Sequence, residues 1–301
     1  MHDLAGVYAA SVTPVVRDSF SPDVKAIPIL LDHFARRGCH GALLLGTTGE
    51  GPSFSSKDRK VIFRAAGEYK DFNPSFRLLA GTGTPSLTET IELTRSAFSS
   101  GFEGVVVLPP YYYRKTSETG LFSWFDELIR QAVPEGGYLL GYHIPPVTGI
   151  GFSLDLLEKL KNKHPQKFAG IKDSSSEVGF ARSLGERFGS DLLVFNGNDK
   201  LFTQALDSQA GGCITALANL YSNELRAIWE GFQNKVAFSM VQERLDRFRT
   251  ILDKYAPYPA ILKALLSRQQ GFPLWGVLPP LMGVSEEISR QAANEFELAE
   301  K

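Results

Sequence analysis

Short apolar runs separated by helix-length amphipathic segments recur along most of the sequence, and this recurrence limits the possible folds more than any other feature. The first run alternates weakly and stops at Pro14. The run at 41–45 is too short for a helix and lacks alternation, which is typical of a strand buried on both faces of a parallel sheet, and the same unit then recurs. The runs lie at residues 6–13, 41–45, 77–80, 104–108, 138–142, 168–171, 192–195 and 212–216.

These eight runs have seven helical segments between them, and an eighth helix is expected near residues 223–232. Because the spacing is regular and leaves no long break between two sheets, we predict a closed parallel (β/α)8 barrel. A doubly wound open sheet is the alternative. The nucleotide-binding fingerprint of that fold is missing, since Gly81-Thr82-Gly83 lacks a third glycine at the required spacing.

The remainder of the chain is expected to form helices outside the barrel. Leu245, Phe248 and Leu252 have helical spacing, and the apolar pattern breaks at 255–259, resumes at 261–266 and breaks again at 273–280. We therefore predict a barrel domain over residues 1–232 and a C-terminal helical extension over residues 233–301. A barrel needs no further helices to close, so we expect the extension to serve also as an oligomer contact.

Composition narrows the class of partner. The 301 residues are 43% hydrophobic and carry a formal net charge of -1, so no basic surface for nucleic acid or an anionic membrane is expected, and a small molecule is the expected partner. Only Cys39 and Cys213 are present, which argues against a disulfide framework and fits a reducing compartment. No basic segment precedes an apolar run at the start, and no stretch approaches the roughly 18 apolar residues of a membrane helix. We expect a cytoplasmic protein.

Lys172 stands at an unusual place, directly after the apolar run at 168–171 and before the loop Asp173-Ser174-Ser175-Ser176. Catalytic groups of a parallel barrel gather at the carboxyl ends of its strands. Removing an ammonium from water favours the neutral amine, which is the nucleophile of Schiff-base enzymes. The alternative is a lysine that extends from the strand end into solvent, and this stretch alone does not decide between the two.

Other strand ends also deliver polar groups. The turn Gly46-Thr47-Thr48-Gly49-Glu50-Gly51 places hydroxyls among glycines, which suits a carboxylate or phosphate ligand but also an ordinary turn with a helix cap. Tyr142 ends the fifth run, and a phenol can pass a proton when a hydroxyl and a cation lie nearby. Residues 196–199 and Thr215 follow the last two runs and suit a hydroxyl-bearing substrate or helix capping.

Other chemistries are disfavoured. The five histidines show no metal-ligand spacing, there is no Gly-x-Ser-x-Gly motif, and Cys213 has no evident base. His143 lies beside the predicted site and is interpreted as a hydrogen-bonding wall. We expect no metal and no cofactor.

Four motifs in order, GTTGE at 46–50, PYYYR at 110–114, YHIPPVTG at 142–149 and GIKDSS at 170–175, span almost the whole chain. Together they resemble the dihydrodipicolinate synthase and N-acetylneuraminate lyase family of class I pyruvate-dependent aldolases. The resemblance implies a (β/α)8 TIM barrel with a C-terminal helical extension, usually assembled as a homotetramer, a dimer of dimers, that forms a pyruvate-type Schiff base.

The same resemblance implies roles for particular residues. Lys172 is similar to the Schiff-base lysine, and Tyr142 to the tyrosine that shuttles protons, with Thr48 beside it. Tyr112 resembles the tyrosine that the family lends across a subunit interface to a neighbour's proton relay. The residues expected to line the substrate pocket are Thr47, Thr48, Gly49, Val147, Gly197 and Ile214, of which the threonine pair binds the 2-oxo acid's carboxylate.

Val147 departs from the family pattern. Dihydrodipicolinate synthases typically carry there an arginine that binds the carboxylate of the incoming semialdehyde, and an apolar side chain cannot replace it. We therefore predict an aldolase that cleaves a 2-keto-3-deoxy sugar acid, or a 4-hydroxy-2-oxoglutarate-type substrate, to pyruvate and an aldehyde. The alternatives are a dihydrodipicolinate synthase, a keto-deoxy sugar acid dehydratase that uses the same lysine, and a non-catalytic barrel that binds a 2-oxo acid.

Overall fold

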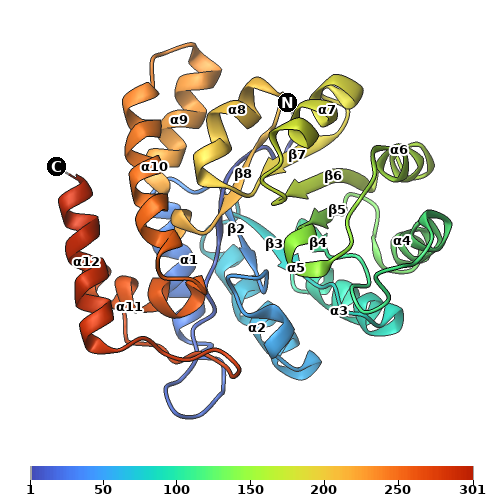
Figure 1. Cartoon of the computed structure of the whole chain (residues 1–301). Helices are drawn as coiled ribbons and strands as arrows, with labels where there is room; N and C mark the ends of the chain where they lie inside the picture. Colours follow the sequence, from blue (N-terminus) through green and yellow to red (C-terminus); the bar gives the residue numbers. More distant parts are fainter. Residues whose placement is uncertain (1, 301) are drawn as a thin grey trace.

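Eight parallel strands form a closed barrel in the computed structural model, which describes residues 2–300 (Figure 1). Each strand pairs with the next in sequence, and β8 pairs with β1. The predicted (β/α)8 barrel is thereby confirmed. The strands are β1 Gly6–Ala10, β2 Gly41–Leu44, β3 Arg77–Gly81, β4 Gly104–Val107, β5 Tyr138–His143, β6 Phe168–Asp173, β7 Leu193–Asn196 and β8 Gly212–Thr215.

Helices surround the strands (Figure 1). Several of them begin where a serine side chain accepts a backbone N–H of the first turn, as Ser55, Ser86, Ser117 and Ser153 do, which satisfies a donor that the helix itself cannot pair. The barrel helices are α1 Ala26–Arg36, α2 Ser56–Glu68, α3 Leu87–Ser99, α4 Glu118–Ala132, α6 Leu154–Lys163, α7 Val178–Phe188, α8 Phe202–Asp207 and α9 Ser222–Asn234, with a short α5 at Pro145–Thr148.

Alternation along the strands divides the apolar side chains between two clusters. One side of each strand packs against the helices, and the other fills the interior of the barrel. The interior cluster contains Leu4, Ala5, Tyr8, Ala10, Leu43, Leu79, Val106, Leu140, Tyr142, Ala169, Leu193, Phe195 and Ile214. On β6, Ile171 belongs to the outer cluster, so the next side chain, Lys172, points into the barrel.

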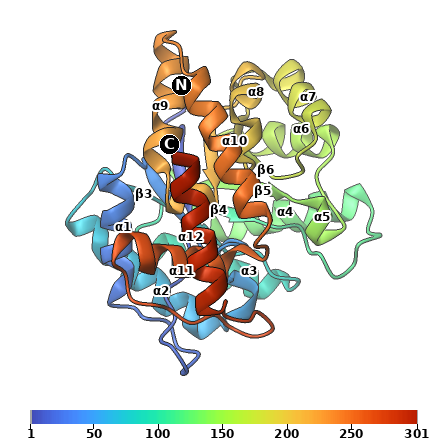
Figure 2. The same cartoon turned by 60° about the vertical axis from the view of Figure 1, so that its left-hand side comes forward.

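Three helices follow the barrel: α10 Ser239–Asp253, α11 Tyr258–Gln270 and α12 Glu286–Glu300. They pack on one another and, through α9, on one side of the barrel (Figure 2). Leu245, Phe248 and Leu252 are buried on α10, as their spacing predicts. The domain boundary between residues 232 and 233 stays a prediction; the last barrel helix continues to Asn234. Within residues 2–300, no helix is both long and apolar enough to cross a membrane.

Candidate active site

Lys172 and Tyr142 are neighbours at the carboxyl ends of β6 and β5. The two residues are in register across the strand pair, and both are buried, with exposed fractions of 3% and 4%. The Lys172 Nζ lies over the Tyr142 ring, 4.2 Å from its centroid. An amine in this position is removed from bulk water and contacts an electron-rich face that favours a cation. The interpretation of Lys172 as a lysine extending into solvent is therefore wrong.

The position of Lys172 within its strand also differs from the prediction. β6 continues through Lys172 to Asp173, and β5 continues to His143, so both polar residues belong to the ladder rather than to the exit loops. Backbone pairing of a rigid strand thus fixes the Lys172 side chain, which orients it better than a loop would.

The Tyr142 hydroxyl has an unusual electrostatic environment. Its oxygen shares a hydrogen bond of 3.1 Å with Thr47 Oγ1. Burial alone raises the pKa of a phenol, but the positive charge of Lys172 and the hydrogen bond with Thr47 outweigh it, so the pKa of Tyr142 lies below its usual value near 10. A lowered pKa suits a phenol that gives and takes a proton during a reaction.

The turn after β2 presents unpaired backbone donors. Among residues 2–300, no acceptor pairs with the N–H groups of Thr47, Thr48 and Gly49, although Thr48 and Gly49 are buried. The N–H of Glu50 donates to the Thr47 carbonyl at 3.1 Å and closes the turn. Successive free N–H groups beside threonine hydroxyls form a concave site that suits a carboxylate.

Glycine is required within this turn by close packing. A Cβ on Gly49 would lie 2.8 Å from the Ser11 carbonyl oxygen, and one on Gly51 would lie 2.0 Å from that of Leu45. The Gly49 carbonyl in turn accepts a hydrogen bond of 2.7 Å from Thr13 Oγ1. The turn is therefore held tightly against the exits of β1 and β2.

Of the other residues predicted to line the pocket, two lie close to the strand ends. Ile214 is fully buried on β8, inside the barrel and in register with Tyr8. Gly197 follows β7, its N–H donates to the Asp173 carbonyl at 2.7 Å, and a Cβ there would lie 2.0 Å from Ser174 Oγ. Gly197 thus allows the exit loops of β6 and β7 to approach each other closely.

Val147 and Tyr112 lie further out. Val147 is 59% exposed on the short helix α5 that follows β5. Tyr112 is 74% exposed and packs edge-on against Tyr113, with ring centroids 5.2 Å apart. Within residues 2–300, its hydroxyl makes no hydrogen bond, so this chain alone does not connect Tyr112 to Tyr142.

His143 forms a wall, as the sequence suggests. Its ring stacks on Phe180 and its Nδ1 accepts the Phe152 N–H at 2.9 Å, while burial lowers its pKa to about 4. The histidine is therefore neutral at physiological pH. Within residues 2–300, no group of three or more His, Cys, Asp or Glu side chains is placed to hold a metal ion.

Two buried ion pairs between the extension and the strand ends were not predicted from the sequence. Lys263 of α11 pairs with Glu50 in the β2 turn, and Arg249 of α10 pairs with Asp199 after β7. A single lysine within the apolar run of residues 259–266 was a signal that could have revealed the first pair. For Arg249, one charge among many on an amphipathic helix, the sequence offers no such signal.

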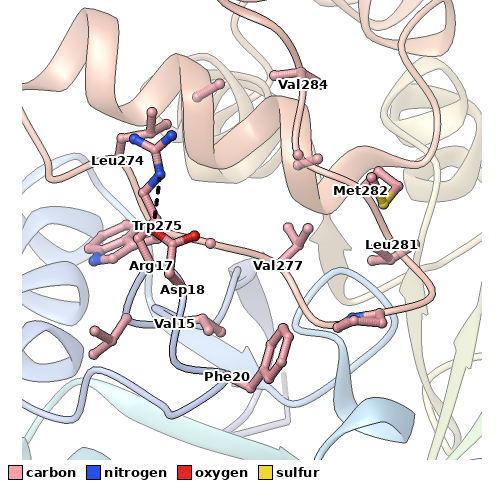
Figure 3. A pocket seen from close by; sticks show the side chains of 16 residues that line it. Val15, Arg17, Asp18, Phe20, Leu274, Trp275, Val277, Leu281, Met282 and Val284 are labelled. Atoms are coloured by element: carbon pink, nitrogen blue, oxygen red, sulfur yellow. Dashed lines mark ion pairs between the residues drawn. The ribbon is translucent and has the colours of Figure 1, made fainter.

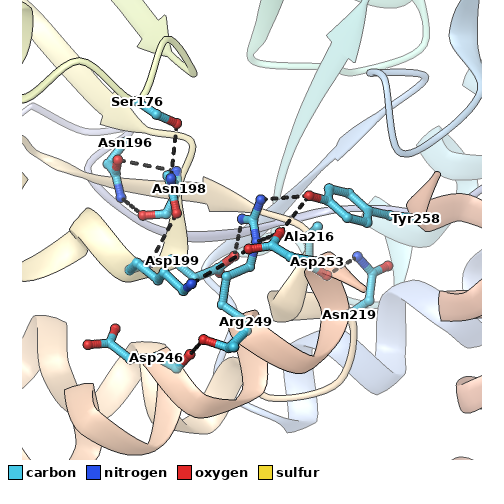
Figure 4. A network of polar contacts seen from close by, with 12 residues as sticks. Ser176, Asn196, Asn198, Asp199, Ala216, Asn219, Asp246, Arg249, Asp253 and Tyr258 are labelled. Atoms are coloured by element: carbon cyan, nitrogen blue, oxygen red, sulfur yellow. Dashed lines mark hydrogen bonds and ion pairs between the residues drawn. The ribbon is translucent and has the colours of Figure 1, made fainter. Parts of the chain in front are cut away.

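Figure 4 shows the second pair within a larger polar network. Arg249 donates to Asp199 Oδ2 at 3.0 Å and to the Tyr258 hydroxyl at 2.9 Å. Burial raises the pKa of Asp199 above its usual value, although Arg249 opposes this. Within residues 2–300, Asp199 Oδ1 and the nearby strand-end group Thr215 Oγ1 make no hydrogen bond.

A large groove lies away from these strand ends. It has a volume of about 530 Å³ and runs between residues 15–20 and 274–284, and its walls are mostly apolar (Figure 3). A much smaller cavity of about 20 Å³ adjoins the site, where it is lined by Thr47, Tyr142 and Arg59 among others. The barrel mouth is therefore identified as the candidate active site by the polar groups that come together there, and not by the volume of its cavity.

A (β/α)8 barrel with a buried lysine and tyrosine at its mouth agrees with the family that the motifs suggest. The profile of the dihydrodipicolinate synthetase family matches residues 3–298, and the chain belongs to that family. It is 34% identical over 291 residues to an uncharacterized DapA-like lyase of Chloroflexus aurantiacus, covering 95% of this chain and 94% of the relative. It is 29% identical to the 4-hydroxy-tetrahydrodipicolinate synthase of Listeria monocytogenes serovar 1/2a, covering 95% of each.

Solved structures match over nearly their whole length. YagE, a prophage protein of the dihydrodipicolinic acid synthase family from E. coli K12 solved in complex with pyruvate, superposes with a TM-score of 0.90 at 24% identity and 99% coverage of each chain. CdNal from Clostridium difficile, solved in complex with mannosamine, gives a TM-score of 0.90 at 23% identity, covering 99% of this chain and 100% of that one. These likenesses support the fold, and the family is one of lyases and synthases.

Proposed function

We propose that this chain is a Schiff-base aldolase that cleaves a 2-oxo acid to pyruvate and an aldehyde, with Lys172 as the nucleophile. One observation carries the proposal: the buried Lys172 amine lies 4.2 Å from the centroid of the Tyr142 ring, and the Tyr142 hydroxyl is hydrogen-bonded to Thr47. This arrangement provides a buried nucleophile and a buried proton carrier next to the hydroxyl of Thr47, a residue exposed at the mouth.

The reaction begins when Lys172 gives a proton to the Tyr142 phenolate and its neutral amine attacks the ketone carbon of the 2-oxo acid. Tyr142 returns that proton to the departing hydroxyl, so water is lost and an iminium forms, which accepts electrons from the bond two atoms away. Tyr142, as the phenolate, removes the proton of the hydroxyl on the carbon that leaves. The carbon–carbon bond two atoms from the iminium then breaks, an aldehyde departs, and the electron pair of that bond stays on the enamine. Protonation of the enamine carbon and addition of water release pyruvate and restore the amine.

The turn after β2 orients the substrate. The N–H groups of Thr47, Thr48 and Gly49 and the hydroxyl of Thr48 hold the carboxylate next to the ketone, while the covalent bond to Lys172 fixes the other end. The complex of YagE with pyruvate supports a 2-oxo acid as the ligand of this fold. Ile214 and Gly197 line the same pocket from β8 and the exit of β7.

The identity of Val147 favours a substrate without a second carboxylate at the mouth. Its side chain is exposed on α5 and offers neither charge nor hydrogen bond. We propose a 2-keto-3-deoxy sugar acid first. A 4-hydroxy-2-oxoglutarate-type acid comes second, because it carries a second carboxylate that Val147 does not bind. Synthesis of 4-hydroxy-tetrahydrodipicolinate, the reaction in the names of several relatives, is the second candidate function.

The proposal extends to assembly. The exposed pair Tyr112 and Tyr113 forms an aromatic surface of the kind that is buried between subunits. We propose a homotetramer, a dimer of dimers, in which Tyr112 reaches the proton relay of a neighbouring copy, and we expect it to work in the cytoplasm. Loss of activity in Tyr112→Phe, together with the mass of the assembly by light scattering, tests this arrangement.

The central experiment is reduction with borohydride in the presence of pyruvate, followed by peptide mass spectrometry. We expect one adduct, on Lys172, and none in Lys172→Ala. An unmodified wild-type chain, or an adduct that persists in Lys172→Ala, contradicts the proposal.

Products then separate the candidate reactions. An aldolase releases pyruvate with an aldehyde from a keto-deoxy sugar acid, whereas a dehydratase on the same lysine releases water and no pyruvate. In the condensation direction, a marked preference for aspartate semialdehyde over sugar aldehydes would favour the synthase and refute the inference from Val147.

A further inference from the structure

Lys263 is a buried charge in the middle of an apolar helix of the extension. It is fully buried on α11, and its Nζ donates to Glu50 Oε1 at 2.5 Å and to the Gly276 carbonyl at 2.6 Å. The other carboxylate oxygen of Glu50 accepts the N–H of Leu278 at 2.7 Å. Lysine and glutamate are separated by 213 positions in sequence, yet each oxygen of the carboxylate is satisfied by the extension.

Glu50 belongs to the turn that we assign to the substrate carboxylate. Its backbone has a φ of 55°, in the left-handed region, which a residue with a side chain adopts only where its surroundings determine it. In this conformation the Glu50 N–H donates to the Thr47 carbonyl, which closes the turn and leaves the N–H groups of Thr47, Thr48 and Gly49 unpaired. The contacts that hold the Glu50 side chain therefore also determine how the N–H groups of Thr47, Thr48 and Gly49 are oriented.

The segment that carries Gly276 and Leu278 also contacts the exit of β1. Figure 3 shows this segment next to residues 15–20, and the Gly276 N–H donates to the Val15 carbonyl at 2.9 Å. Close by, Thr13 Oγ1 donates to the Gly49 carbonyl. The extension therefore braces the turn from two directions, through the Glu50 side chain and through the β1 exit.

Stability alone does not explain an ion pair in this position. Buried ion pairs add little net stability, because desolvation of two charges offsets their attraction, and well-packed apolar residues of similar size often do as well or better. What the pair adds over apolar residues is direction, since two oxygens and one ammonium fix distances and angles.

We propose that Lys263 and Glu50 are positioning residues for the carboxylate of the 2-oxo acid, and that the C-terminal extension sets the shape of the carboxylate site through them. This inference rests on the proposed function, because it assumes that the turn binds that carboxylate. Neither residue touches the substrate; both act through the backbone of Thr47, Thr48 and Gly49.

The test compares steady-state kinetics of Glu50→Gln, Lys263→Met and the apolar double variant Glu50→Leu/Lys263→Met with the wild type. The carboxylate is held equally in the bound and transition states, so loss of its geometry should raise the KM for pyruvate in the condensation assay about ten- to a hundredfold and change kcat by less than about threefold. Borohydride trapping at saturating pyruvate should still modify Lys172.

The apolar double variant keeps the test informative where a single variant fails to fold. Removing one partner leaves a buried charge alone, whereas the double variant removes both charges. It should be destabilised less than Lys263→Met, although the Leu278 N–H and the Gly276 carbonyl lose a hydrogen bond. We expect its KM for pyruvate to stay high even so. A KM within about twofold of the wild type in this folded variant overturns the proposal, since the pair would then be only a structural link.

A matched control comes from the other buried pair of the extension. Asp199→Asn/Arg249→Met removes both charges of that pair, which lies at the exit of β7 rather than at the β2 turn. We expect a lower thermal midpoint with an unchanged KM for pyruvate. An equal rise in KM for both pairs contradicts a specific role for Lys263 and Glu50. A wild-type chain that forms no pyruvate adduct refutes the proposed function itself and, with it, this role.

Discussion

The pKa values of two tyrosines inside the same barrel are shifted in opposite directions. Tyr8 lies at the amino-terminal end of the interior and Tyr142 at the carboxyl end, and both are buried, with exposed fractions of 0% and 4%. Burial raises the pKa of Tyr8 above its usual value, while the pKa of Tyr142 is lowered. Both residues are tyrosines buried in the barrel interior, so the difference comes from their neighbours.

At Tyr8, burial raises the pKa and the nearby Arg77 opposes this without offsetting it. The Tyr8 hydroxyl donates to the Leu4 carbonyl at 2.7 Å, and its ring packs edge-on against Phe195. A carbonyl oxygen accepts a hydrogen bond from the neutral phenol, but it has no proton to donate to a phenolate. Tyr142 instead has Lys172 over its ring and Thr47 at its hydroxyl. Burial therefore suppresses ionisation of a phenol unless its neighbours outweigh it. Arg77 near Tyr8 lowers the pKa too little to do so, whereas Lys172 and Thr47 together outweigh burial at Tyr142.

The largest effect is expected from removing the cation. In Lys172→Met the pKa of Tyr142 should rise above 10, because burial is then opposed only by the hydrogen bonds with Thr47 and Ser174. Catalysis should fall by at least about 10⁴-fold, since the nucleophile is lost as well. Ultraviolet absorbance of the phenolate during pH titration measures the first effect, with Lys172→Met/Tyr142→Phe as the reference. A Tyr142 that still ionises below pH 10 would break the comparison.

The second test removes one tyrosine hydroxyl at each end of the barrel, in two separate variants. Tyr142→Phe should lower kcat by about 10²- to 10³-fold through loss of the proton carrier, while leaving the borohydride adduct on Lys172. Tyr8→Phe removes the same atom from the same kind of environment and should keep kcat within about twofold. Equal losses in the two variants would show that the barrel interior, not the site, limits turnover.

The fold was predictable because buried parallel strands are encoded locally. Every apolar run became a strand, and the errors lie at the strand ends, where β5 and β6 continue through His143 and Lys172. Local polarity suggested that these strands had ended. His143 and Lys172 are polar because they lie at the candidate site, not because the strand ends before them. Functional positions are therefore where the local sequence pattern predicts strand ends wrongly.

The site was predictable only in part. Motifs in the turn after β2 and at the ends of β5 and β6 pointed to Thr47, Tyr142 and Lys172, and the structure brings these three together. The contact of Lys263 with Glu50 joins positions 213 apart, and no periodicity can reveal it. Contacts of this kind depend on how the extension packs on the barrel, which follows from tertiary structure alone.

A third variant, for which we expect a smaller effect, removes only the hydroxyl that is hydrogen-bonded to Tyr142. Thr47→Val keeps the shape of the side chain but deletes the hydrogen bond to the Tyr142 oxygen. The pKa of Tyr142 should move upward, though less than in Lys172→Met, and kcat should fall about tenfold, in line with the loss of one hydrogen bond to a charged group. Thr48→Val serves as the control, since its hydroxyl is not bonded to Tyr142, and should leave the phenol titration unchanged.

The smallest effect concerns stability at the amino-terminal end. An unfolded tyrosine ionises near pH 10, and folding raises the pKa of Tyr8, so above about pH 10 the folded chain keeps a proton that the unfolded chain has lost. The contribution of Tyr8 is therefore complete below pH 10 and declines as the pH rises further. Tyr8→Phe should cost about 1 kcal/mol at pH 7 through the lost hydrogen bond to Leu4, and this deficit should shrink between pH 10 and 11.5. Urea midpoints of both chains measure it. A deficit that grows with pH would mean that folding favours the ionised form of Tyr8, and the contrast with Tyr142 would disappear.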